Sequence, residues 1–121
     1  MPHKNLEAWK QSMSLVVEIY NETKKFPKEE IFGLSQQMRR SAVSVPSNIA
    51  EGCSRNGKKE TIQFLFIAKA SLAELETQVI ISNKVGYISD VLTKEIITKI
   101  DEIKRILIGL IKLYKSKNSN I

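Results

Sequence analysis

Pro46 stands in the middle of a segment whose apolar and polar residues both keep helical spacing. The apolar positions step by three or four residues: Ile31, Leu34, Met38, Ala42, Val45 and Ile49. A polar series has the same spacing: Gln37, Ser41, Ser44, Asn48 and Glu51. Residues three and four apart share one face of an α-helix. Both series stay in register across Pro46, although an internal proline costs a helix about 3 kcal/mol. The pattern therefore predicts one helix from about Lys28 to Cys53, kinked at Pro46, and not two helices.

Three further segments have amphipathic helical spacing. The first runs from about Asn5 to Lys25 and ends before Pro27, with the predicted core stripe Leu6, Trp9, Met13, Val16 and Tyr20. The third runs from Lys58 to about Val85, with the stripe Leu65, Ala68, Leu72, Leu75 and Val79. The fourth runs from Ser89 or Asp90 to about Lys117, with the stripe Ile96, Ile100, Ile103, Leu107, Leu110 and Tyr114. Short loops make neighbouring helices antiparallel, so we expect an all-α, antiparallel up-and-down four-helix bundle forming a single domain over residues 1–121.

Several classes of protein are disfavoured by simple features of the chain. No apolar run approaches the ~18 residues of a membrane span, and the polar start at residues 1–5 lacks the apolar core of a signal peptide. Cys53 is the single cysteine, which rules out an intramolecular disulfide. We therefore expect a cytoplasmic protein with no membrane partner.

Residues suited to catalysis are scarce. His3 is the only histidine, no Cys/His group has metal-ligand spacing, and no glycine-rich phosphate loop is present. Cys53 is expected to be a small buried residue beside a helix end. We predict no catalytic residue, no cofactor and no metal, and hence a protein that is not an enzyme.

The polar series on the second helix has a counterpart on the third, Ser71, Glu74 and Gln78, spaced by three and four residues. If the two series face each other, Asn48 and the serines can bond to Glu74 and Gln78 in a buried network that fixes which helices pair. The amide of Asn48 can also donate to a carbonyl that Pro46 leaves without a donor. The other interpretation is a groove that binds a ligand or partner.

The last two helices carry more apolar residues than one core requires. Outside the stripes lie Phe64, Phe66, Ile67, Ile80, Ile81, Ile97, Ile106, Ile108, Ile111 and Leu113. A helix that is apolar around most of its circumference must be covered on more than one side. This predicts self-association, and the alternative is a wide core within one chain.

The net charge is +6, from 19 basic and 13 acidic residues, which suits an anionic partner. One basic group is expected near the second loop, and it comprises Arg39, Arg40, Arg55, Lys58 and Lys59. A second follows the last acidic residue, Glu102, and comprises Lys104, Arg105, Lys112 and Lys115. Cations near a helix C-terminus also complement the helix dipole, so part of the second group has a structural explanation.

Three stretches carry a resemblance to a known family: residues 5–11, residues 37–52 with the string Ser-Val-Pro-Ser-Asn-Ile-Ala-Glu-Gly, and residues 64–78. They resemble the small bacterial four helix bundle proteins, which include proteins encoded in intervening sequences of 23S ribosomal RNA genes and the accessory variability protein of diversity-generating retroelements. The motif positions are Arg39, Arg40, Ser44, Pro46, Asn48, Glu51, Gly52, Ser71, Glu74 and Glu76. The chain departs from the pattern at Cys53, where an aromatic residue is common, and at Ala70, where glycine is common.

The resemblance implies an up-and-down bundle that assembles into a homopentameric ring. The retroelement relatives bind nucleic acid and associate with a reverse transcriptase. We therefore predict a non-enzymatic oligomer that binds nucleic acid, RNA rather than DNA, through the basic residues named above. Aromatic residues make up only 7% of the chain, so we expect little base stacking and little sequence specificity. The alternative is an assembly scaffold whose partner is a reverse transcriptase or another protein.

Overall fold

The computed structural model describes residues 2–118, with residues 117 and 118 described by their backbone only. The helices are α1 (Glu7–Thr23), α2 (Leu34–Cys53), α3 (Lys58–Lys84) and α4 (Asp90–Asn118). Two short 3-10 turns, η1 (His3–Asn5) and η2 (Lys28–Glu30), precede α1 and α2. Within this described part the chain forms helices and turns and no strand, which confirms the all-α prediction.

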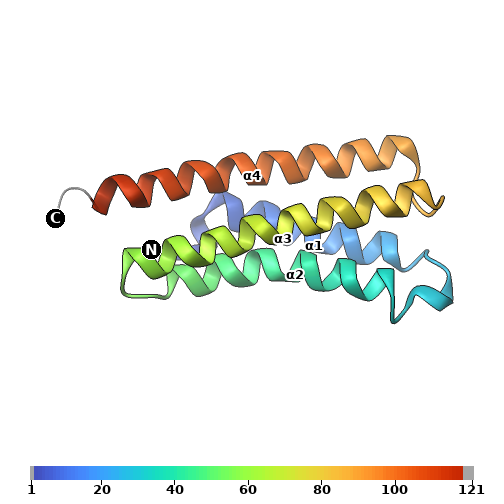
Figure 1. Cartoon of the computed structure of the whole chain (residues 1–121), viewed down its shortest axis with the longest axis horizontal. Helices are drawn as coiled ribbons and strands as arrows, with labels where there is room; N and C mark the ends of the chain where they lie inside the picture. The colour runs from blue at the N-terminus through green and yellow to red at the C-terminus, as the bar shows by residue number, and fades with distance from the viewer. Residues whose placement is uncertain (1, 119–121) are drawn as a thin grey trace.

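The four helices alternate in direction and lie side by side along the long axis (Figure 1). Each packs against its neighbours in chain order, and α4 returns to pack against α1, whereas the diagonal pairs α1–α3 and α2–α4 stay apart. The α1–α2 and α3–α4 connections meet at one end of the bundle, and the α2–α3 turn lies at the other (Figure 1). The predicted four-helix bundle is confirmed. None of these helices, within residues 2–118, has the length and apolarity to cross a lipid bilayer.

The core is closest to prediction in α3 and α4. All five predicted residues of the α3 stripe are fully buried, as are Ile96, Ile100, Ile103 and Leu107 of α4. Leu110 and Tyr114 are only half-buried, and the neighbouring Ile111 enters the core instead. In α2 the buried stripe is Met38, Ala42, Val45 and Ile49, and the helix continues through Pro46 as one element.

The predicted core face of α1 is wrong by one position. The residues that α1 buries are Ala8, Ser12, Leu15, Ile19 and Thr23. Met13 remains 41% exposed and Tyr20 38% exposed, while Trp9 and Val16 are half-buried. The buried face includes two hydroxyl side chains, Ser12 and Thr23, so the sequence pattern alone does not identify it as the core face. The hydroxyls of Ser12 and Thr23 donate to the carbonyls of Ala8 and Ile19, each at 2.7 Å, so that neither is buried without a partner.

The start of the second helix also differs from prediction. Residues 28–33 form η2 and a turn, and α2 begins only at Leu34. The Oε1 atom of Glu30 accepts a hydrogen bond from the backbone N–H of Leu34 at 3.1 Å, which satisfies one amide at the new helix start. Ile31, predicted in the core, is 55% exposed in this turn.

Candidate nucleic-acid interface

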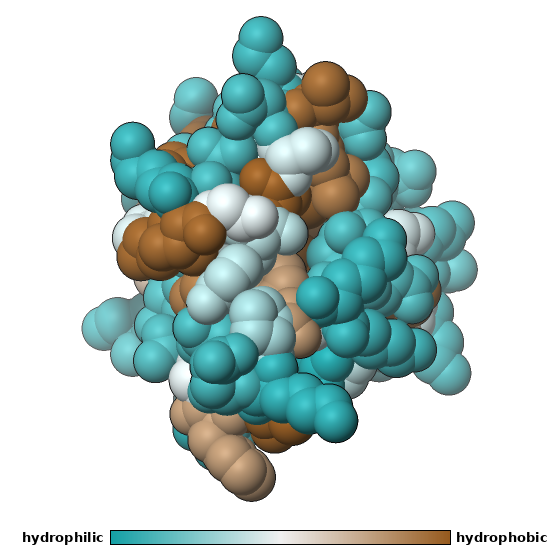
Figure 2. Space-filling view, turned by 90° about the vertical axis from the view of Figure 1, so that its right-hand side faces the viewer, coloured by the Kyte–Doolittle hydropathy of each residue, from teal (hydrophilic) through white to brown (hydrophobic). Residues whose placement is uncertain are grey.

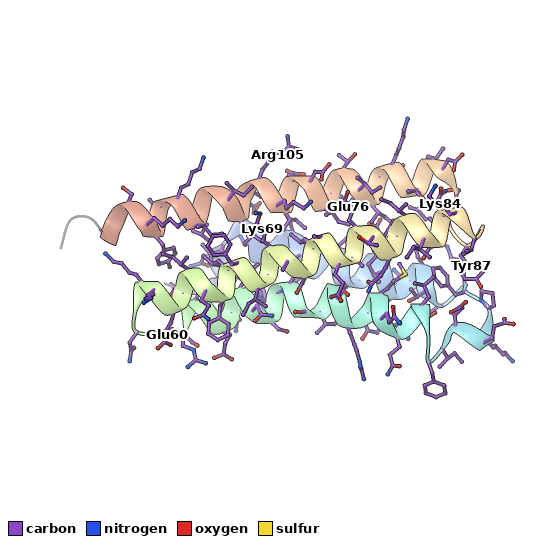
Figure 3. All side chains as sticks on the ribbon, in the orientation of Figure 1. Glu60, Lys69, Glu76, Lys84, Tyr87 and Arg105 are labelled. Carbon is purple, nitrogen blue, oxygen red and sulfur yellow. The ribbon has the colours of Figure 1, made fainter. Side chains whose placement is uncertain are left out.

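A groove between α3 and α4 gathers lysine side chains around an exposed aromatic ring. We call it the α3–α4 groove; it has a volume of about 350 Å³ and is lined by Phe66, Lys69, Ala70, Ala73 and Lys104. The small side chains of Ala70 and Ala73 leave the space between the two helices open. In Figure 3, Lys69 and Glu76 project from α3 toward α4, and Arg105 lies on the far edge of α4.

Contacts within the groove place the lysine charges close together. The Nζ atom of Lys115 lies 5.3 Å from the centroid of the Phe66 ring, and that of Lys69 lies 6.0 Å from it. Lys104 donates to Oε1 of Glu76 at 3.0 Å, with both side chains less than a third exposed. Phe66 itself is 44% exposed. The groove therefore brings three cations, one of them paired with Glu76, beside an accessible ring.

Two further predicted cations, Arg105 and Lys112, lie on the solvent-facing side of α4 and are exposed. They are seven residues apart, so they lie on the same face of the helix, separated by about 10 Å. The second predicted basic group therefore divides in two. Lys104 lines the groove and Lys115 lies over the Phe66 ring beside it, whereas Arg105 and Lys112 lie on the solvent-facing side of α4.

The first predicted basic group does not form one patch, which corrects the sequence interpretation. Arg39 and Arg40 lie in the first half of α2, whereas Arg55, Lys58 and Lys59 lie around the α2–α3 turn at the other end. At about 1.5 Å per helical residue, the two sets are about 20 Å apart along the bundle. Sequence proximity to the turn was misleading because the helix is long.

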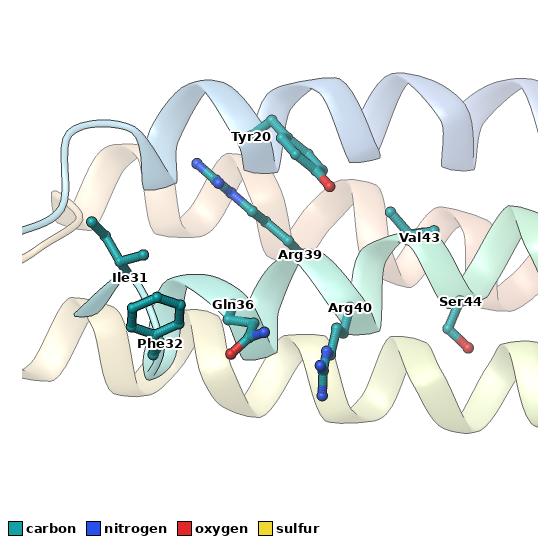
Figure 4. Close-up of a pocket in the computed structure, with 8 residues that line it drawn as sticks. All are labelled: Tyr20, Ile31, Phe32, Gln36, Arg39, Arg40, Val43 and Ser44. Carbon is teal, nitrogen blue, oxygen red and sulfur yellow. The ribbon is translucent and has the colours of Figure 1, made fainter. Parts of the chain in front are cut away.

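Arg39 holds α1 and α2 together. Its Nε donates to Oγ1 of Thr23 at 2.8 Å, and its guanidinium lies 4.7 Å from the centroid of the Tyr20 ring. Arg40, the next residue, points away from α1 (Figure 4). Both line an open groove of about 560 Å³, together with Tyr20, Ile31, Phe32, Gln36, Val43 and Ser44.

The cations at the α2–α3 turn differ in their availability. Arg55 pairs with Glu51 at 2.9 Å and Glu60 at 3.8 Å, and its guanidinium also lies 4.9 Å from the centroid of the Phe64 ring. Lys58 is half-buried and Lys59 is exposed at the start of α3. Lys59 is therefore better placed than Arg55 to meet an external anion.

The polar series of α2 and α3 meet where the two helices pack. Ser41 donates to Oε1 of Glu74 at 3.0 Å, and the hydroxyls of Ser44 and Ser71 are 2.8 Å apart. Asn48 donates to the Ser44 hydroxyl at 2.9 Å, and Ser71 donates to the Ile67 carbonyl at 3.0 Å. With Ser44 donating to Ser71, these bonds form one chain from Asn48 through both serines to a backbone carbonyl.

Other members of the series behave differently from what was expected. Glu51 pairs with Arg55, Gln37 is exposed, and Oε1 of the buried Gln78 has no hydrogen-bond partner among the described residues. The amide of Asn48 donates to the Ser44 carbonyl at 2.8 Å. This is not the carbonyl that lacks a donor because of Pro46, which is the carbonyl of residue 42, four residues earlier. The expectation that Asn48 compensates for the proline is therefore wrong.

The network requires α2 and α3 to approach closely, and Gly52 permits this near the turn. A Cβ atom at Gly52 would lie 3.0 Å from the Phe64 Cβ and 3.2 Å from the Thr61 carbonyl oxygen. The Thr61 hydroxyl donates to the Gly52 carbonyl at 2.8 Å. This end of the α2–α3 pair therefore has no room for a larger residue.

Two features of the site are missing from the sequence-based prediction. Phe66 is predicted only as surplus apolar surface, and Lys69 is absent from the predicted contacts. The spacing Phe66, Lys69, Ala70, Ala73 was the available signal, since it places a ring, a cation and two small residues on one face over two helix turns.

Other chemistry has little support in the structure. Burial raises the pKa of the Cys53 thiol, which keeps it protonated and unreactive near neutral pH. Within the described residues, no cluster of three or more His, Cys, Asp or Glu side chains is arranged to hold a metal ion.

The fold, the α2–α3 network and the basic groove together define a small basic four-helix bundle. The chain belongs to the 23S rRNA-intervening sequence protein family, whose model matches residues 4–109. This confirms the resemblance carried by the three sequence stretches. A solved structure with 27% sequence identity and a TM-score of 0.81 is a protein of unknown function from the S23 ribosomal protein family of Bacteroides thetaiotaomicron, and the match covers 87% of this chain and 98% of that one. No curated protein matches this chain.

Proposed function

We propose that this protein is a non-enzymatic, self-associating nucleic-acid-binding protein of the cytoplasm that favours RNA and reads little sequence. The observation that carries this proposal is the α3–α4 groove, where Lys69, Lys104 and Lys115 converge and Glu76 pairs with only one of them, Lys104. Arg105 and Lys112 extend the positive surface along α4. Lysine contacts to phosphates are independent of base identity, which accounts for low specificity.

Self-association is supported by apolar residues that the single chain leaves exposed. At the end of the bundle seen in Figure 2, apolar patches stand among hydrophilic residues. Ile31, Phe32, Val85 and Val91 are exposed near the connections at this end, and Phe32 is 87% exposed. Along the sides, Ile67, Ile81, Ile108 and Leu113 are also exposed. Burying such surfaces between copies would stabilise an oligomer, and we favour the pentameric ring that the family resemblance implies.

A ring would strengthen the attraction for a polyanion. The charge of +6 per chain would be repeated by every subunit, and one strand could contact several basic grooves at once. Affinity would then fall steeply with salt, because each neutralised phosphate releases counterions.

The test is the retention of labelled single-stranded RNA by the purified protein at low and high salt. Lys112→Gln combined with Lys115→Gln should weaken binding. It should also reduce the slope of the logarithm of the binding constant against the logarithm of the salt concentration, by about 0.7 for each phosphate that is no longer neutralised. The matched control is Lys24→Gln combined with Lys94→Gln, which removes the same charge from exposed positions outside the groove. Absence of RNA binding by the wild type at low salt, or equal loss in both double variants, would contradict the proposed site.

A second candidate function, an assembly scaffold for a reverse transcriptase or another protein, is favoured by the groove between α1 and α2. Besides the part shown in Figure 4, a second hollow of about 380 Å³ continues past Val43 along Pro46, Trp9, Met13 and Val16. An apolar surface of this kind suits a protein partner. Substituting Val43 and Met13 with aspartate separates the two functions, because it should abolish capture of a protein partner and leave RNA retention by the folded protein unchanged.

A further inference from the structure

We propose that Phe66 is a stacking platform for an unpaired base, so that the α3–α4 groove selects single-stranded over duplex RNA. This inference rests on the proposed function and adds to it a specific contact and a preference for strand state. It also revises the expectation that base stacking contributes little, which came from the low aromatic content of the whole chain.

The surroundings of Phe66 suit a base attached to a phosphate. The ring is 44% exposed and borders a groove of about 350 Å³. Ala70 and Ala73, which form the neighbouring part of α3, present only methyl groups, so that no bulky side chain fills the space beside the ring. Lys69 and Lys115 lie within 6.0 Å of the ring centroid, close enough to hold the phosphates on either side of a stacked nucleotide.

The lysines over the ring do not exclude a base. Each cation–ring contact is made by a flexible side chain at the surface, where such contacts are weak. A base stacked on an aromatic side chain is held more strongly, and a displaced lysine can move to a phosphate and keep its charge compensated. Lys104 is more firmly placed, because it is paired with Glu76 at 3.0 Å, and that pairing compensates its charge. The uncompensated charge beside the ring therefore comes from Lys69 and Lys115.

Duplex RNA cannot use this ring. Its bases are stacked on one another inside the helix, and it presents backbone and groove edges to a protein. The lysines would attract both forms, and the ring would add affinity for the single strand alone. A second exposed ring provides the contrast: Phe32 is 87% exposed but lies at the end of the bundle that carries the α1–α2 connection, away from Lys69 and Lys115.

The experiment compares Phe66→Leu, Phe66→Trp and the control Phe32→Leu for binding to a polyuridine strand and to a duplex RNA of equal length. Leucine retains apolar bulk without a ring, and tryptophan retains a ring. We expect Phe66→Leu to lose roughly tenfold or more in affinity for the single strand, the scale of one stacked base, with duplex binding unchanged. Phe66→Trp and Phe32→Leu should bind both RNAs as the wild type does. Thermal unfolding and light-scattering mass are measured for every variant.

The outcomes separate the two proposals. If Phe66→Leu binds the single strand like the wild type, the stacking inference is overturned and the electrostatic function stands. If the wild type binds neither RNA at low salt, the proposed function fails and the inference fails with it. If Phe66→Leu changes the mass of the particle and lowers binding to both RNAs equally, the ring belongs to an interface between copies, which also overturns the inference.

Discussion

Replacing Gly52 with alanine tests the close contact between α2 and α3. In most helix positions this change stabilises a protein, because alanine is up to about 1 kcal/mol more favourable than glycine in a helix. At Gly52 the added methyl would lie 3.0 Å from the Phe64 Cβ and 3.2 Å from the Thr61 carbonyl oxygen. Both atoms are fixed by the α3 backbone, so no side-chain rotation relieves the contact.

The expected loss follows from two effects. The added methyl group overpacks the contact and forces the two helices apart, which costs about 1–3 kcal/mol. The same movement stretches the buried hydrogen bond from the Thr61 hydroxyl to the Gly52 carbonyl, which is worth about 0.5–1.5 kcal/mol. After the propensity gain is subtracted, we expect Gly52→Ala to lower the free energy of unfolding by about 1–3 kcal/mol.

Gly109→Ala is the matched control. Gly109 lies within α4 and is exposed, and a methyl group added there would meet no other side chain or helix within 4 Å. There the substitution should raise the free energy of unfolding by about 0.5–1 kcal/mol. Urea denaturation followed by circular dichroism, at one fixed protein concentration, measures both. A Gly52→Ala protein as stable as the wild type, or shifted in the same direction as Gly109→Ala, would refute the close-contact argument.

Two more predictions concern polar contacts. Ser71→Ala removes the hydroxyl that bonds to Ser44 and should lower the free energy of unfolding by about 0.5–1.5 kcal/mol. A double-mutant cycle with Ser44→Ala measures the coupling energy between the two hydroxyls, and additive losses of stability would show that they do not interact. The Tyr87 hydroxyl donates to Oε2 of Glu30 at 2.9 Å, and this bond raises the pKa of Tyr87 above its ordinary value of 10.0. The stability it adds is therefore complete below pH 10.0 and is lost as the pH rises through the raised pKa. Tyr87→Phe should be less stable than the wild type at about pH 8, and the difference should shrink by about pH 11; a difference that grows with pH would contradict the assignment.

The bundle was predictable from sequence where spacing and chemistry agree. The five residues of the predicted α3 stripe, from Leu65 to Val79, are all apolar, and all of them are buried. In α1 two stripes compete, and the more apolar one contains Met13 and is partly exposed. Ser12, on the other stripe, is buried because its hydroxyl finds a partner in its own helix, which spacing alone does not show.

The candidate site was less predictable, because it depends on which residues of different helices meet. Lys104 and Lys115 were recognisable from their charge, but their proximity to Phe66 and Glu76 follows from the pairing of α3 with α4. Arg39 was predicted as a nucleic-acid contact because of its charge, but its side chain already contacts Thr23 and Tyr20 of α1. Charge identifies cations in a sequence, whereas their partners decide which of them can meet a phosphate.

An even number of antiparallel helices has a practical consequence. α1 begins and α4 ends at the pole that also carries the α2–α3 turn, so a fluorescent or affinity tag attached before α1 or after α4 joins the bundle at that pole (Figure 1). The opposite pole, where Phe32 and Val91 are exposed, stays unobstructed in such fusions. Tagged proteins are thus suited to detecting contacts made through the pole opposite the termini, whereas experiments on Lys58 and Lys59 call for the tag to be removed.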